Sequence, residues 1–261
     1  MAAHCFDAPV QGSASQKRRH SLSRRACAAS WQHTIPNANA FAGLTLPWFF
    51  LRFRFTLATP YMSRGEEADN YKVTRDWTFN CPYVRASTWK GVLLSTCRDI
   101  LNDKPNKKER LEYLFGTEKA VVVAGADVEG RRGHLHFFPT FFDVEPRPAY
   151  LMPMPRKTRG GGTLATLEAV MPGATGDFAI LLAADLVTDI GWYARFISGA
   201  IFFLLIRDGF GGKRLKGFGL ARQQVTEVSL WTPAVGPRNL GEIALSTLHD
   251  RVSVELRGTT P

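Results

Sequence analysis

Residues 48–57 read Trp-Phe-Phe-Leu-Arg-Phe-Arg-Phe-Thr-Leu. Every second position from Phe49 to Leu57 is apolar, and Arg52 and Arg54 lie between these positions. Successive side chains of a β-strand point to opposite faces of a sheet, so this alternation predicts a strand with one face against a core. A chain of 261 residues, 45% of them hydrophobic, is long and apolar enough to build that core.

Two helices are predicted where apolar residues recur at helical spacing. The first covers 87–100, and Ser87 is expected to be its N-cap. The second covers 189–205 and is expected to be capped by Thr188 or Asp189. This second helix is apolar nearly all round, which predicts a buried position.

Three further strands are predicted, at 134–142, 178–184 and 220–230. Pro139 lacks an N–H group, so it favours an edge position or a bulge in the first of them. A loop or an extended hairpin is expected at 146–162, which is rich in Pro, Gly and Arg. The order strand, helix, strand, strand, helix, strand predicts an α+β fold, namely a ferredoxin-like (RRM-like) βαββαβ core with long insertions.

Composition divides the chain into three parts. Residues 1–40 hold five basic residues but only one acid, Asp7, and show no hydrophobic periodicity. This favours a disordered basic leader, although an RNA-binding tail and an organellar transit peptide have similar compositions. The folded domain is expected at 41–232, and a weakly patterned C-terminal extension is expected at 233–261.

The formal net charge of +10 favours a polyanionic partner, with nucleic acid ahead of an anionic membrane surface. Four cysteines without a CxxC pair indicate a reducing, cytoplasmic compartment. The longest apolar stretches, 48–57 and 194–206, are too short to span a bilayer, so no membrane partner is predicted.

The segment 207–222 reads Arg-Asp-Gly-Phe-Gly-Gly-Lys-Arg-Leu-Lys-Gly-Phe-Gly-Leu-Ala-Arg and lies between the second helix and the last strand. Glycines permit positive φ angles and close backbone approach, and backbone N–H groups together with cations can hold phosphates. The spacing is not that of a P-loop. The predicted phosphate-binding residues of this loop are Gly209, Gly211, Gly212, Lys213, Arg214, Lys216, Gly217 and Gly219.

This glycine-rich loop resembles the one that members of the RAMP superfamily (repeat-associated mysterious proteins) carry before their final strand. The segment 81–98, Cys-Pro-Tyr-Val-Arg-Ala-Ser-Thr-Trp-Lys-Gly-Val-Leu-Leu-Ser-Thr-Cys-Arg, is similar to the "PYIPGSSLKG" start of a RAMP helix. Arg85-Ala86 replaces the Pro-Gly of that pattern. Residues 114–116 and 133–137 resemble the "FG…GxLxF" segment of the same family.

The resemblance implies a CRISPR-associated, guide-RNA-binding structural subunit of a type III effector complex in antiviral defence. Its partners would be guide RNA, target RNA and sister RAMP subunits, and base pairing would supply the sequence specificity. By position, the helix residues implied to contact RNA are Ser87, Thr88, Lys90 and Arg98. Helical spacing places Ser87, Lys90 and Arg98 on one face.

Two catalytic alternatives remain open at this point, and a non-catalytic role is favoured over both. Some type III RAMP subunits cut RNA with a loop aspartate and a divalent metal such as magnesium, and Asp69 lies near the implied position. A stand-alone endoribonuclease that processes CRISPR repeat RNA would need a general acid and base, for which His134 and His136 are the candidates. No zinc-ligand spacing is visible, and no cofactor is predicted firmly.

Aromatic residues near the start of the first helix have two interpretations. They could stack on bases, or they could belong to the core, which is the commoner case. The residues are Trp77, Phe79, Tyr83 and Trp89.

Overall fold

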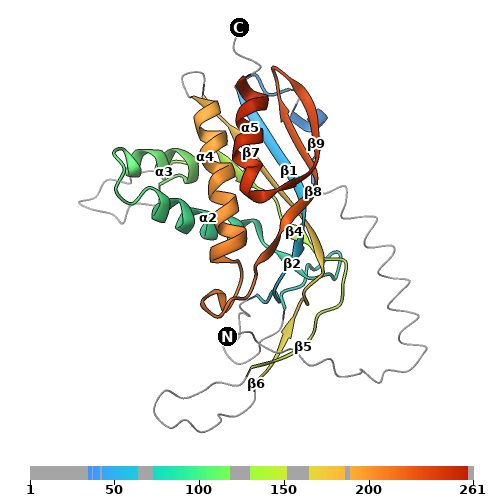
Figure 1. The fold of residues 1–261 in the computed structure, drawn as a ribbon. Helices are drawn as coiled ribbons and strands as arrows, with labels where there is room; N and C mark the ends of the chain where they lie inside the picture. The colour runs from blue at the N-terminus through green and yellow to red at the C-terminus, as the bar shows by residue number, and fades with distance from the viewer. Residues whose placement is uncertain are drawn as a thin grey trace.

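The computed structural model describes residues 35–36, 38–41, 43–63, 73–117, 130–151, 165–185 and 189–257. Its centre is a five-stranded sheet with helices packed on one face (Figure 1). The mixture of helices and antiparallel strands that the sequence predicts is therefore present. Asp69 and the leader up to residue 34 lie outside the described residues.

All neighbouring strands of the main sheet are antiparallel, and their order is β3-β7-β1-β8-β9. β1 lies in the middle and pairs with β7 on one side and β8 on the other. The strands are β1 (Trp48–Leu57), β3 (Leu135–Phe137), β7 (Thr175–Ala183), β8 (Ala221–Thr232) and β9 (Gly236–Ala244).

Two small ribbons and four α-helices complete the secondary structure of the described residues. The ribbons pair β2 (Tyr83–Val84) with β4 (Thr140–Phe141), and β5 (Arg147–Leu151) with β6 (Ala165–Ala169). The helices are α2 (Ala86–Ile100), α3 (Lys107–Phe115), α4 (Ile190–Phe203) and α5 (Leu248–Arg257). Short turns are the 3-10 helices η2 (Ala38–Phe41), η4 (Arg214–Lys216) and η5 (Leu245–Thr247), and the π-helix η3 (Leu204–Asp208).

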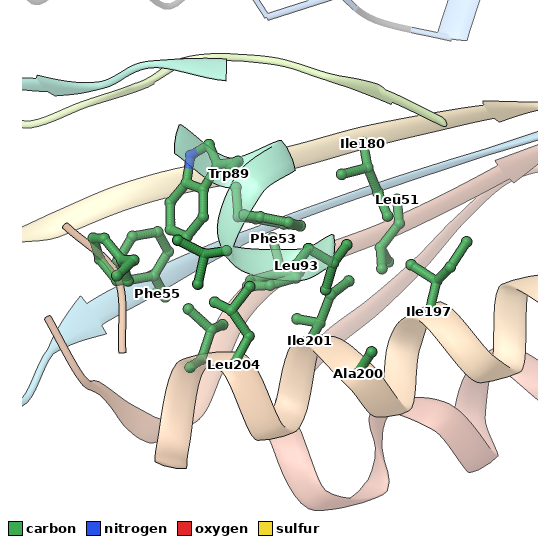
Figure 2. Packing of buried hydrophobic residues seen from close by; sticks show 14 of the residues in the cluster. Leu51, Phe53, Phe55, Trp89, Leu93, Ile180, Ile197, Ala200, Ile201 and Leu204 are labelled. Atoms are coloured by element: carbon green, nitrogen blue, oxygen red, sulfur yellow. The ribbon is translucent and has the colours of Figure 1, made fainter. Parts of the chain in front are cut away.

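The core lies between the sheet and the helices, and β1 contributes the residues expected of it. Phe53 and its alternate neighbours on β1 are fully buried and face Leu93 of α2 and Ile201 of α4 (Figure 2). Trp89 of α2 packs edge-on against Phe178 of β7, with ring centroids 4.9 Å apart. Burying large apolar side chains from both layers is the main source of stability for this arrangement.

The opposite face of the sheet carries a buried charge cluster. Asp177 of β7 is 1% exposed and accepts hydrogen bonds from Arg52 (3.0 Å) and Arg54 (2.9 Å) of β1. Arg54 also pairs with Glu227 of β8. Two cations around one buried carboxylate compensate its desolvation, so the polar positions of β1 hold three strands together.

A smaller apolar cluster lies at the other end of this face. Phe41 of η2 packs against Phe50, with ring centroids 5.1 Å apart, and Ile35 is buried in the same cluster. Residues at the end of the predicted leader therefore contribute to the core.

The structure corrects two local predictions and adds one helix that was not predicted. The strand predicted at 134–142 is two strands, because β3 joins the main sheet whereas β4 pairs with β2 beyond Pro139. Helix α2 has Arg85 rather than Ser87 at its N-cap, and the Arg85 side chain donates to the Tyr83 hydroxyl (3.2 Å) instead of capping the helix. The charged run before residue 113 forms α3, whose apolar residues Leu111 and Leu114 reach the core.

Helix α4 is capped as predicted and runs without a break into η3. The side chain of Asp189 accepts a hydrogen bond from the Trp192 N–H (3.0 Å). The combined helix, Ile190–Asp208, has 19 residues and a mean hydropathy of 1.4, so its length and composition would suffice to cross a membrane. The apolar stretch 194–206, which is too short by itself, is part of this longer helix. In the fold, its residues Ile197 and Leu204 are fully buried in the core.

The C-terminal extension completes the sheet and the helical layer. β9 pairs with β8, and Leu248 and Val252 of α5 are fully buried in the main core. Figure 1 shows α5 beside α4 on the same side of the sheet.

Candidate nucleic-acid interface

Three glycines of the glycine-rich loop are required by its packing. A Cβ on Gly209 would lie 2.5 Å from the Phe218 carbonyl oxygen, and one on Gly219 would lie 1.9 Å from the Phe210 carbonyl oxygen. A Cβ on Gly211 would lie 2.4 Å from the carbonyl oxygen of Met62, in the loop that follows β1. All three also have positive φ angles, so the two ends of the loop approach each other backbone to backbone.

Several glycine amides of the loop are used inside the protein. The Gly212 N–H donates to the Met62 carbonyl (2.7 Å), and the Gly219 N–H donates to the Pro60 carbonyl (2.8 Å). The Gly217 N–H donates back to Arg214 (2.8 Å). These three amides are therefore engaged, and the phosphate role expected of the loop falls mainly on its side chains.

The cations of the loop stand on a single short turn. Lys213 has a left-handed backbone (φ 59°) and leads into η4, which contains Arg214 and Lys216. Lys213 and Lys216 are exposed, Arg214 is half-buried, and the apolar Leu215 between them is fully exposed. Such a turn presents positive charge to solvent, where a polyanion can reach it.

A cavity of about 160 Å³ connects this loop to the start of α2. Gly211 contributes from the loop, and Arg85 and Thr88 contribute from the helix start. The Tyr61 hydroxyl donates to the Tyr83 carbonyl (3.1 Å), and burial raises the pKa of that hydroxyl. The full lining is Tyr61, Ser63, Thr74, Tyr83, Arg85, Thr88 and Gly211.

A larger groove of about 990 Å³ runs between α2 and α3. From α2 it takes Ser87, Lys90, Gly91, Leu94 and Arg98, and from α3 and the residues that follow it takes Lys107, Lys108, Leu111, Glu112, Phe115, Gly116 and Thr117. The lining therefore combines cations with the apolar side chains of Leu94, Leu111 and Phe115.

The four predicted RNA-contacting residues of α2 are therefore divided between two neighbouring hollows. Thr88 lies with Gly211 at the small cavity, whereas Ser87, Lys90 and Arg98 line the groove. Lys107 and Lys108 were not predicted from the sequence, because residues 102–112 are mostly charged and polar and carry little apolar signal. Local apolar spacing at 111, 114 and 115 was the signal that could have identified the helix carrying them.

His134 and His136 are held at the edge of the sheet. The His134 ring stacks on Tyr113 with centroids 4.2 Å apart, and its Nδ1 lies 2.8 Å from the Ala183 carbonyl oxygen. Burial, together with the positive charges of His134 and Lys90, lowers the pKa of His136. The contacts of His134 give it a packing role at this edge, because both its ring face and its Nδ1 are engaged within the protein.

The loop at 63–80, which follows β1 and contains Asp69 and Asp76, is described only at residue 63 and from residue 73 onward. Asp76 accepts hydrogen bonds from the Thr78 and Phe79 N–H groups, both at 2.9 Å, so its carboxylate stabilises a turn. Within the described ranges, no group of three or more His, Cys, Asp or Glu residues could hold a metal ion. Asp69 lies outside those ranges.

The four aromatic residues separate clearly into core and surface. Trp89 is fully buried and donates from Nε1 to the Thr140 hydroxyl (3.0 Å). Tyr83 stacks on Phe141 (5.8 Å), and Phe79 meets the same ring edge-on (5.4 Å). Trp77 is 100% exposed and remains a candidate for base stacking.

The "FG…GxLxF" residues also have a structural explanation. A Cβ on Gly116 would lie 2.4 Å from the Arg131 carbonyl oxygen, and one on Gly133 would lie 2.3 Å from the Leu114 carbonyl oxygen. The two glycines thus let the end of α3 contact the segment that leads into β3.

Comparison with known proteins agrees with these motifs. A sequence model of the RAMP superfamily matches residues 51–222, whereas no curated protein matches the chain. One solved structure with a similar fold is a chain of "Type III-B Cmr-beta bound to cognate target RNA", determined by cryo-electron microscopy. The TM-score is 0.55 at 13% identity, and the match covers 86% of this chain and 79% of the other. Because the family match spans more than half of the chain, the protein belongs to the RAMP superfamily.

Proposed function

We propose that this protein is a guide-RNA-binding structural subunit of a cytoplasmic type III CRISPR effector complex in antiviral defence. Membership of the RAMP superfamily and the fold likeness to a chain of a type III-B complex support this role. The observation that carries it is the basic turn Lys213–Lys216, which lies two residues after Gly211 of the cavity at the start of α2. Sister RAMP subunits and target RNA are the other proposed partners.

We also propose a ferredoxin-like core. The strand order β3-β7-β1-β8 with α2 and α4 on one face supports it, and β9 with α5 is then an addition at the β8 edge. In this arrangement the glycine-rich loop and the start of α2 lie at the same end of the core, so one RNA backbone can reach both.

Purification of the complex from its native host, followed by sequencing of the bound RNA, tests the proposal. We expect guide RNA and sister subunits with the wild type, and loss of the RNA when Lys213, Arg214 and Lys216 are all changed to Ala. The RNA-binding constant of the variant can also be measured at several salt concentrations. Its logarithm should depend less steeply on log salt concentration, by about 0.7 for each phosphate of single-stranded RNA that the variant no longer neutralises.

The matched control changes Lys104, Arg195 and Arg251 to Ala, which removes the same charge from exposed positions outside both hollows. The control should retain RNA. Absence of RNA from the wild-type preparation would refute the proposed function. Equal loss of RNA in both triple variants would show that the loop variant acts only by lowering the net charge, and the loop would then not be a binding site.

A further inference from the structure

We propose that the groove between α2 and α3 is a second binding site for the RNA strand. In this site Gly91 lets the RNA backbone lie close to α2, and Lys107 and Lys108 bind phosphates from the α3 side. The inference rests on the proposed function and extends it from the motif residues of α2 to α3, which the sequence motifs do not include. Three features of the groove carry it.

The first feature is charge. Lys90 and Arg98 from α2 and Lys107 and Lys108 from α3 line the same groove, and Glu112 is the one acid among the described residues of the lining. Glu112 lies 3.8 Å from Lys108 in a pair whose lysine side chain is 90% exposed. Exposed pairs of this kind are weak, so Lys108 can exchange its partner for a phosphate.

The second feature is the position of the two lysines on α3. They occupy its first turn, where the helix dipole is positive, and Asn106 before them has a left-handed backbone without a side-chain cap. Cations at this end are unfavourable for the isolated helix but add to its attraction for an anion. Lys107 donates to the Asn102 side chain (3.2 Å), which holds it near the helix start.

The third feature is Gly91, which lies in the middle of α2. Among the described residues outside its own stretch of helix, no heavy atom lies within 4 Å of the position that its Cβ would take, so the packing of these residues does not require glycine there. Glycine is a poor residue for a helix interior, yet its surface faces the groove. A ligand backbone lying against the helix is a physical reason for the missing side chain.

The occupant we infer is RNA rather than an acidic peptide. Ser87, in the groove, is next to Thr88, which lines the cavity at the glycine-rich loop, so one strand can pass from the loop over the first turn of α2 into the groove. From Ser87 to Arg98 the helix extends about 16 Å, at 1.5 Å per residue, which is long enough for several phosphate positions. The floor of Leu94, Leu111 and Phe115 suits the ribose and base edges.

Fluorescence anisotropy with labelled single-stranded RNA, over a range of salt concentrations, tests the groove in the full chain. We expect Lys107→Ala with Lys108→Ala to weaken binding about tenfold and to make the dependence of log K on log salt concentration shallower by about 1.4, that is, about 0.7 for each of two phosphates. Gly91→Ala should also weaken binding about tenfold while raising the unfolding midpoint in urea, since Ala is the better helix former.

Matched variants keep the result interpretable. Gly199→Ala adds a methyl group to α4 at another glycine with no neighbour within 4 Å, and Lys104→Ala with Arg251→Ala removes two exposed cations outside the groove. Both should bind RNA as the wild type does. Wild-type RNA binding by the Lys107/Lys108 and Gly91 variants, with no binding by the loop triple variant, would overturn the groove alone.

Two other outcomes are distinct. If the loop triple variant also binds as the wild type does, the proposed function fails together with the groove. If the groove variants bind RNA normally but no longer purify with sister subunits, the groove holds a protein segment and the RNA assignment is wrong.

Discussion

Thr96 of α2 donates a hydrogen bond of 2.6 Å to Asp208, the last residue of η3 and the neighbour of the first glycine of the glycine-rich loop. Thr96 is fully buried, and the same carboxylate is bonded by Arg207 at 2.7 Å. The contact joins the helix that carries Lys90 and Arg98 to the base of the loop that carries Lys213. Both candidate surfaces are thereby fixed in one orientation.

Replacing Thr96 by Val should lower the free energy of unfolding by about 1 kcal/mol, because a half-buried carboxylate loses one of its donors while Arg207 remains bonded to it. Urea unfolding measures the change. Thr96→Ser retains the hydroxyl and should lie closer to the wild type than the Val variant. Equal stability of the Val variant and the wild type would show that the bond contributes nothing.

The same contact predicts a pH dependence. Burial alone would raise the pKa of Asp208, but the hydrogen bonds from Arg207 and Thr96 outweigh it, and the pKa lies below its usual value. The folded state therefore favours the ionised form, so the contribution to stability is present above the unfolded pKa of about 3.9 and is lost as pH falls through the folded pKa.

Urea midpoints measured from pH 7 down to pH 3 should show this loss in the wild type. Asp208→Asn cannot ionise, so its curve should fall less steeply over the same range. Parallel curves for the two proteins would assign the acid sensitivity to other carboxylates.

Glycines of the loop should differ in their tolerance of Ala. Gly219→Ala should destabilise the fold by more than about 1 kcal/mol, since its Cβ would meet a carbonyl oxygen at a positive φ. Gly212→Ala, whose Cβ would have its first neighbour at 3.5 Å, should change stability by less than about 0.5 kcal/mol. Denaturant unfolding of the two variants compares them directly, and the reverse order would contradict the packing described.

Two tryptophans should respond in opposite ways. Trp89→Ala should lower the free energy of unfolding by about 3–5 kcal/mol, as a fully buried ring is lost from the core. Trp77→Ala should leave stability unchanged because the ring is fully exposed, and should weaken RNA binding by about 1–3 kcal/mol if the ring stacks on a base. Unfolding and anisotropy measurements separate the two effects, and Trp77→Phe should retain most of the binding.

The buried carboxylate of the sheet should be essential for stability. Asp177→Asn leaves Arg52 and Arg54 without their shared counter-charge, and a loss of about 3–5 kcal/mol is expected in urea unfolding. Glu227→Gln, at a 57% exposed partner of Arg54, should cost less than about 1 kcal/mol. Similar losses for both variants would mean that burial does not distinguish the two pairs.

Elements with strong periodicity were predictable from the sequence. The alternation over 48–57 identifies β1, and Asp189 identifies the start of α4, because both signals depend on neighbours within a few residues. The glycine and lysine content of 207–222 likewise identified the loop. Its family resemblance is confirmed by the superfamily match.

Helix α3 and the break near Pro139 were not predictable in the same way. The charged run at 107–112 gives little apolar signal, and its helix is stabilised by Leu111 and Leu114 packing on distant parts of the chain. Beyond Pro139 the backbone leaves the main sheet because β4 finds its partner in β2. Such choices depend on strands far away in sequence.

The sequence alone determined which residues are apolar, which are basic and where glycine interrupts them, since these are local properties of the chain. Only the tertiary structure decided that Thr88 lines one cavity with Gly211 while Lys90 lines a groove with Lys108. Helical spacing places residues on a face but does not say which element lies opposite. That is set by the packing of α2 against α3 and by the Thr96 to Asp208 hydrogen bond, both of which exist only after the core has formed.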